Sequence, residues 1–111
     1  MSNQERDIET YFRHRIEAAG GVAFKFVSPG NAGVPDRIVI LPWGRVVFVE
    51  LKQAKGRLSG MQKWQRERIR KRGGTVRTLW SKEQVDEFMQ EMEGGRADGV
   101  QAVRVSDTGH R

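Results

Sequence analysis

Two short apolar runs separated by a tight turn constrain the fold of this chain more than any other feature. The runs are residues 38–41 (Ile-Val-Ile-Leu) and 46–49 (Val-Val-Phe-Val), and Pro42, Trp43 and Gly44 lie between them. This pattern predicts an antiparallel hairpin with strands over residues 36–41 and 45–52. Because neither run alternates with polar residues, we expect both faces of these strands to be covered by other parts of the protein.

Capping residues and the helical spacing of apolar side chains predict three helices. Each begins at a serine followed three positions later by Glu or Gln, which is the capping-box pattern, and each ends at a glycine pair. The serines are Ser2, Ser59 and Ser81, the glycine pairs are residues 20–21, 73–74 and 94–95, and the stripe expected to be buried on the third helix is Val85, Phe88, Met89 and Met92. Further strands over residues 22–27 and 75–80 complete an α/β order of αβββαβα.

The length of 111 residues and the absence of cysteine predict one domain without disulfides or thiolate-bound metal. We expect residues 1–95 to form this domain. Residues 96–111 are mostly polar and contain glycine, and they could form either a tail or an added edge strand. No apolar run is long enough for a membrane-spanning helix, and the polar N-terminus is unlike a signal peptide, so we expect a cytoplasmic protein.

Positive charge is concentrated in one part of the chain. The formal net charge is +6, and between residues 52 and 77 only Glu67 opposes the basic residues. These basic residues are Lys52, Lys55, Arg57, Lys63, Arg66, Arg68, Arg70, Lys71, Arg72 and Arg77. Such a concentration is expected of a nucleic-acid-binding protein, because each neutralised phosphate releases counterions. The alternative is a solvated helix face with no ligand.

Three ionisable residues are predicted to converge at one end of the hairpin. Glu50 and Lys52 are two residues apart on one strand, so their side chains share a face. Asp36 opens the neighbouring strand, and antiparallel pairing brings it to the same end as Glu50. Two carboxylates would repel each other there unless a cation lies between them, and Mg²⁺ is the natural candidate because it prefers oxygen ligands. Lys52 would orient the attacking water or stabilise charge in the transition state of phosphodiester hydrolysis.

At these residues the sequence resembles the PD-(D/E)XK nuclease superfamily and, within it, the VRR-NUC family. The resemblance extends over residues 9–88 and is carried by residues 33–36 (Gly-Val-Pro-Asp), 49–52 (Val-Glu-Leu-Lys) and 58–62 (Leu-Ser-Gly-Met-Gln). It implies a restriction-endonuclease-like fold with a central mixed sheet flanked by helices. It also implies a stand-alone bacterial or phage nuclease, cytoplasmic in the bacterial or infected cell, that cuts branched DNA such as four-way junctions as a homodimer.

The resemblance assigns roles to five residues. It implies that Asp36, Glu50 and Glu9 bind Mg²⁺, which Mn²⁺ could replace, that Lys52 is the catalytic lysine and that Gln62 is the polar residue of the following helix. Each has a structural alternative. Asp36 could be a turn residue and Lys52 the partner of Glu50 in an ion pair. Gln62 could serve only its capping box, and Glu9 could lie on a solvated face.

Residues outside this set are expected to contact DNA. The loop over residues 28–33 would let the backbone approach DNA, with Lys25 and Ser28 near the site. The basic residues expected to bind phosphates are Lys55, Arg57, Lys63, Arg66 and Arg70. The leading prediction is therefore a Mg²⁺-dependent DNA endonuclease. The rival prediction is a non-catalytic nucleic-acid-binding module that has kept the fold and the charge.

A homodimer is expected because a single site cannot make two symmetric cuts in a junction, whereas two-fold pairing supplies a second site. Trp43, Trp64 and Trp80 lend modest support, since aromatic side chains are favoured at the centres of interfaces. The alternative is that these tryptophans belong to the core of the domain.

Overall fold

The structure is a computed structural model that describes the backbone of residues 3–110 and the side chains of residues 6–96. Seven helices and strands follow one another in the predicted αβββαβα order, which is confirmed. They are α1 (Asn3–Ala18), β1 (Val22–Lys25), β2 (Arg37–Ile40), β3 (Val46–Leu51), α2 (Gly60–Lys71), β4 (Val76–Leu79) and α3 (Lys82–His110). None of the described helices is long and apolar enough to cross a membrane.

The four strands form one mixed sheet in the order β1-β2-β3-β4. Strands β1, β2 and β3 pair antiparallel, and β3 pairs parallel with β4. The predicted hairpin is confirmed, with Gly44 at a φ of +83° in the turn between β2 and β3. A parallel pair needs a crossover connection, and α2 lies in the connection between β3 and β4.

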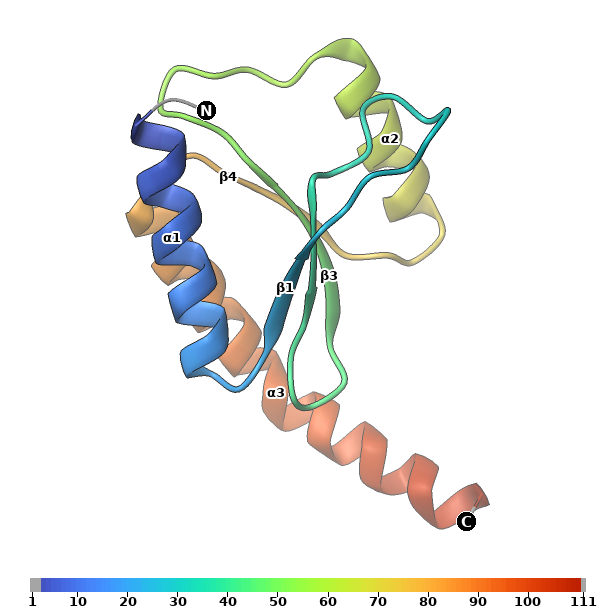
Figure 1. Cartoon of the computed structure of the whole chain (residues 1–111). Coiled ribbons are helices and arrows are strands. Elements are labelled where there is room, and N and C mark those ends of the chain that lie inside the picture. The colour runs from blue at the N-terminus through green and yellow to red at the C-terminus, as the bar shows by residue number, and fades with distance from the viewer. Residues whose placement is uncertain (1–2, 111) are drawn as a thin grey trace.

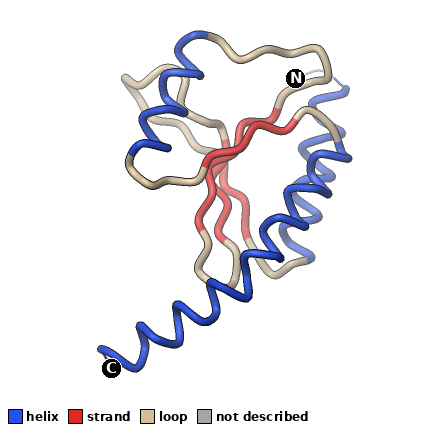
Figure 2. The backbone as a smooth tube through the Cα atoms, turned by 180° about the vertical axis from the view of Figure 1, so that it is seen from behind, coloured by secondary structure: helices blue, strands red, loops and turns tan. Residues whose placement is uncertain are grey.

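One face of the sheet forms the hydrophobic core with α1 and α3. Side chains that alternate along β2 and β3, among them Val39, Val47 and Val49, are fully buried on this face. They belong to one cluster with Phe12 of α1 and Phe88 of α3, whose rings lie 6.2 Å apart. Figures 1 and 2 show α1 and α3 together on this side of the strands and α2 on the other. The stripe predicted to be buried on α3 is confirmed.

The opposite face of the sheet is only partly covered, so the expectation that both faces are buried is wrong here. Helix α2 packs against β4 and leaves apolar side chains of β1, β2 and β3 open. Phe24 is 54% exposed, Val46 46% and Ile40 39%. Within the part of the chain whose side chains are described, these three residues are therefore not part of the core.

The capping boxes explain where the later helices begin. Ser59 Oγ accepts from the Gln62 backbone N–H at 3.1 Å, and Gln62 Oε1 accepts from the Ser59 N–H at 2.8 Å. Ser81 Oγ likewise accepts from the Gln84 N–H, also at 3.1 Å, before α3. Both predicted starts are confirmed, whereas the predicted cap at Ser2 lies outside the described residues.

The end of α3 differs from the prediction. The helix continues through Gly94 and Gly95 to His110 instead of ending at this glycine pair, so residues 96–110 are helical and do not form an edge strand. Neither glycine adopts the positive φ of a helix-ending residue, unlike Gly20 after α1 and Gly73 after α2. Glycine weakens a helix but does not forbid one. The division of the chain into a domain over residues 1–95 and a separate tail stays a prediction.

Candidate active site

The carboxylates of Asp36 and Glu50 lie together at one end of the sheet. Asp36 directly precedes β2 and Glu50 is the penultimate residue of β3, and the register that pairs Arg37 with Val49 brings both to the same end. Asp36 Oδ1 also accepts from the backbone N–H of Leu51 at 3.3 Å. The predicted convergence of these two acidic residues is confirmed.

The surroundings of the two carboxylates disfavour two negative charges. Burial raises the pKa of Glu50 to about 7, and the nearby Asp36 carboxylate contributes to this rise while Lys52 opposes it. Burial also raises the pKa of Asp36, against the opposing effect of Arg37. The negative charges of the two carboxylates are only partly neutralised by their basic neighbours. Carboxylate oxygens in such a pair are the ligands that a divalent cation prefers.

Two further side chains reach Glu50, one from the end of β3 and one from α2. Lys52 Nζ lies 3.8 Å from Glu50 Oε2, which confirms that the two side chains share a face. Gln62 Nε2, on the first turn of α2, donates to the same oxygen at 3.3 Å. Since Gln62 Oε1 simultaneously closes the capping box, this residue both begins the helix and contacts the site. The two interpretations offered for Gln62 are therefore compatible.

Gly33 allows the loop before Asp36 to pack directly on α2. Its φ is +88°, and a Cβ there would lie 2.6 Å from the carbonyl carbon of Met61 and 2.9 Å from the Gln62 nitrogen. Any side chain would push the loop away from the first turn of α2. The glycine of the Gly-Val-Pro-Asp motif thus sets the distance between Asp36 and Gln62.

Arg37 is a site residue that the sequence reasoning missed. Its side chain is buried and donates to Glu9 Oε2 at 2.5 Å and to the Asp36 carbonyl at 3.0 Å. It also lies 3.2 Å from Asp36 Oδ2. The apolar run that follows Asp36 was one available signal, because it implied that β2 is buried and that an arginine within it needs partners.

Glu9 lies on α1 and is held by Arg37 instead of standing beside the other two carboxylates. Among the described residues, no three acidic, histidine or cysteine side chains gather closely enough to hold a metal ion. The structure therefore brings Asp36 and Glu50 together and links Glu9 to them through a guanidinium. The assignment of Glu9 as a metal ligand stays a prediction.

The residues expected to bind DNA fall into different environments. Lys55, Arg57 and Lys63 line one pocket beside the site. Arg70 is paired with Glu67 at 3.0 Å, and Arg66 is half-buried with its Nε atom enclosed and without a partner. Arg66 is thus less open to solvent than Arg70, so the basic residues of α2 do not form one uniform face.

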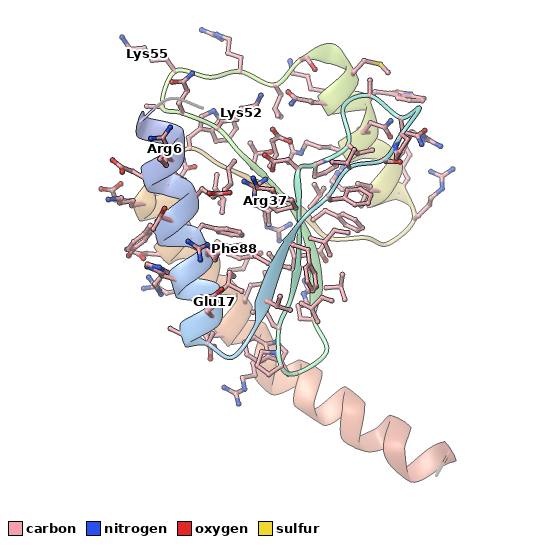
Figure 3. The ribbon with its side chains drawn as sticks, in the orientation of Figure 1. Arg6, Glu17, Arg37, Lys52, Lys55 and Phe88 are labelled. Carbon is pink, nitrogen blue, oxygen red and sulfur yellow. The ribbon has the colours of Figure 1, made fainter. Side chains whose placement is uncertain are left out.

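The remaining expected contacts lie near the loop before β2. Lys25 is exposed at the end of β1, opposite Arg37 in the register. Ser28 Oγ accepts from Asn31 Nδ2 at 2.9 Å, so its hydroxyl serves the loop itself. Figure 3 shows Lys52 and Lys55 at the same end of the molecule as Arg6 of α1, which the sequence reasoning did not single out. Positive charge therefore surrounds the carboxylate pair from more than one element.

Comparisons with known proteins identify relatives of this chain. No model of a known protein family matches the chain. A solved structure described as a VRR_NUC domain is 37% identical, with a TM-score of 0.75, over 80% of this chain and 97% of the other. A protein named "Putative nuclease p44" from Acyrthosiphon pisum secondary endosymbiont phage 1 is 51% identical over 49 residues, which are 44% of this chain and 53% of that protein. The match thus spans about half the length of the phage protein.

Proposed function

The chain belongs to the VRR-NUC nuclease family, and from this premise we propose that it is a Mg²⁺-dependent endonuclease that hydrolyses phosphodiester bonds in branched DNA such as four-way junctions. The observation that carries the proposal is the Asp36 and Glu50 pair with Lys52 and Gln62 beside it. These four side chains come from the motifs on which the family resemblance rests. The mixed sheet flanked by helices is the restriction-endonuclease-like fold expected for them.

Asp36 and Glu50 are the residues that would hold the metal ion. Their oxygens are hard donors, and the raised pKa of Glu50 reflects an environment in which a bound cation would favour the ionised form. When bound, Mg²⁺ would neutralise charge on the scissile phosphate and lower the pKa of a water molecule. Glu9 would approach this ion only by leaving Arg37, or it would act through Arg37 by fixing Asp36.

Lys52 and Gln62 have complementary tasks in the proposed reaction. The Lys52 ammonium, close to Glu50 Oε2, is placed to stabilise negative charge that develops on the phosphate or to orient the attacking water. Gln62 donates to the same carboxylate oxygen and so fixes the orientation of Glu50. Because both act on one oxygen, the position of Glu50 depends on α2 as well as on β3.

The exposed apolar face of the sheet supports the proposed homodimer. Val22, Ile40 and Val46 lie next to one another across β1, β2 and β3, and Phe24 lies two residues after Val22 on the same face; no helix of the described residues covers them. Trp64 on α2 is 53% exposed, so it does not belong to the core as one alternative held. Adjacent exposed apolar side chains of this kind are typical of interaction surfaces. A second copy would bring the second site that symmetric cleavage requires.

Cleavage of defined DNA substrates tests the proposal. The protein would be incubated with hairpin, flap, bubble and four-way-junction DNA in Mg²⁺, Mn²⁺ or EDTA, beside the Asp36→Asn and Glu50→Gln variants. We expect cleavage of branched DNA in Mg²⁺ or Mn²⁺, none in EDTA, and none by either variant although both still bind DNA. The exposed Arg13→Gln variant serves as control. Binding without cleavage by the wild-type protein in every metal would instead support the non-catalytic module.

A further inference from the structure

A pocket of about 590 Å³ opens beside the proposed active site. It lies between the loop that follows β3, the first turns of α2 and the end of β4. Its lining includes Lys55, Gly56, Arg57, Leu58, Lys63 and Trp80. The pocket therefore combines three cationic side chains with one aromatic ring, and its volume is in the range of pockets that bind small ligands.

Trp80 is held firmly in the wall of this pocket. Its indole Nε1 donates to the Gly56 carbonyl at 2.6 Å, and its backbone N–H donates to Gln84 Oε1 at 2.7 Å. The ring is half-buried, so part of its surface remains available. An aromatic ring whose orientation is already fixed loses little conformational entropy when a flat ligand stacks on it.

The pocket adjoins Lys52 directly. The Lys52 backbone N–H donates to the carbonyl of Leu79, the residue before Trp80, at 2.9 Å. A Cβ placed on Gly56 would lie 3.4 Å from Lys52 Cδ, so the aliphatic part of Lys52 runs along the pocket wall. Gly56 thus contacts both the proposed catalytic lysine and the indole of Trp80. A ligand in the pocket would therefore lie next to the phosphate on which Lys52 is proposed to act.

The charge of the pocket selects an anionic ligand. Lys55, Arg57 and Lys63 form no ion pair with an acidic side chain in the part of the chain that the structure describes. Of the residues whose side chains are described, no acidic one lines the pocket either. Three uncompensated cations around one concave space match a phosphate group, and the indole matches a planar base.

We propose that this pocket binds one unpaired nucleotide of the DNA substrate next to the scissile phosphate, with its base on Trp80 and its phosphate among Lys55, Arg57 and Lys63. The proposal rests on the proposed nuclease function and adds to it a preference for a strand that is unpaired beside the cut. A base inside a duplex is stacked on both sides, so only an unpaired base can reach a single indole face. Stacking would also make the pocket tolerant of base identity.

Binding of a short oligonucleotide without metal tests the pocket separately from catalysis. The three indole N–H signals of the protein would be followed by NMR in EDTA during titration with thymidine tetranucleotide, and Trp80→Phe identifies the Trp80 signal by its loss. We expect the Trp80 signal to shift and the Trp43 signal at the distant hairpin turn to stay unchanged. An unshifted Trp80 signal at saturating oligonucleotide would overturn the proposal.

Binding assays with flap and duplex DNA add an independent measurement. For a flap with one unpaired nucleotide at the cut, we expect Trp80→Ala to weaken binding about tenfold or more relative to the wild-type protein, while binding to fully paired duplex stays nearly unchanged. Trp80→Phe keeps an aromatic face and should retain much of the preference, and Arg13→Gln should retain all of it.

The outcomes separate the two proposals. A shifted Trp80 signal in a protein that cuts no DNA would support the pocket and contradict the nuclease function. If the wild-type protein cleaves DNA with metal, but Trp80→Ala loses the same affinity for paired and for unpaired substrates, the pocket proposal alone would be contradicted.

Discussion

Arg37 and Glu9 join the first helix to the strand that carries the proposed metal ligand. The Arg37 guanidinium donates to Glu9 Oε2 at 2.5 Å from a buried position, across 28 residues of sequence. The same guanidinium holds the Asp36 carbonyl and lies near its carboxylate. The orientation of Asp36 is therefore coupled to the docking of α1 on the sheet.

Removing the Arg37 charge should destabilise the protein strongly. We expect Arg37→Met to lower the free energy of unfolding by about 3 kcal/mol, because Glu9 is left without its buried partner. The double variant Arg37→Met with Glu9→Gln should lose less than the sum of the two single variants. Urea unfolding of the four proteins measures this coupling, with the exposed Arg13→Met as control. Strictly additive losses would contradict the inferred coupling.

The raised pKa of Glu50 predicts a pH-dependent cost in the metal-free protein. Its pKa of about 7 in the folded protein exceeds the ordinary glutamate value of 4.5, so Glu50 of the unfolded chain ionises first as the pH rises. The contribution of Glu50 to the free energy of unfolding is therefore fully retained below pH 4.5. It is lost between pH 4.5 and about 7, where Glu50 is ionised in the unfolded chain but still protonated in the folded protein. In EDTA, we expect Glu50→Gln to be more stable than the wild-type protein at pH 8, by about 2 kcal/mol.

Thermal unfolding of both proteins across this pH range gives the comparison. The difference in stability should shrink toward pH 4.5 and should also shrink at pH 8 when Mg²⁺ is added, since the cation favours ionised Glu50. A difference that does not vary with pH would show that another effect of the substitution is responsible.

The basic residues of the site should differ in their contribution to the salt dependence of DNA binding. If Lys63 neutralises a phosphate, Lys63→Gln should flatten the log–log slope by about 0.9. Arg70→Gln should flatten it less, because Arg70 is already paired with Glu67. Fluorescence anisotropy at several salt concentrations measures both slopes. Equal slopes for Lys63→Gln and the wild-type protein would show that Lys63 does not contact a DNA phosphate.

The exposed face of the sheet predicts a variant that separates the dimer. A carboxylate introduced by Phe24→Asp, whose phenylalanine is 54% exposed on this face, should convert a dimer to a monomer in sedimentation equilibrium at micromolar concentration. Ala18→Asp, on the exposed side of α1, adds the same charge elsewhere and should leave the mass unchanged. A monomeric wild-type protein that still cuts both strands of a junction symmetrically would refute the dimer.

The sequence by itself determined the order of the elements and the core of the site. Hairpin and capping signals are local, because they depend on residues within a few positions of one another. The side-chain alternation of a strand is equally local, so Glu50 and Lys52 had to share a face. Antiparallel pairing through a short turn then placed Asp36 beside Glu50. These features could therefore be predicted without knowing how the helices pack on the sheet.

Only the tertiary structure decided which partners these residues meet. The contact of Arg37 with Glu9 depends on how α1 lies on the sheet, and the contact of Trp80 with Gly56 joins residues 24 positions apart. The uncovered face around Phe24 likewise follows from α2 docking against β4 and leaving β1, β2 and β3 open. Packing of this kind depends on the combined shape of several elements, which no local pattern of residues encodes.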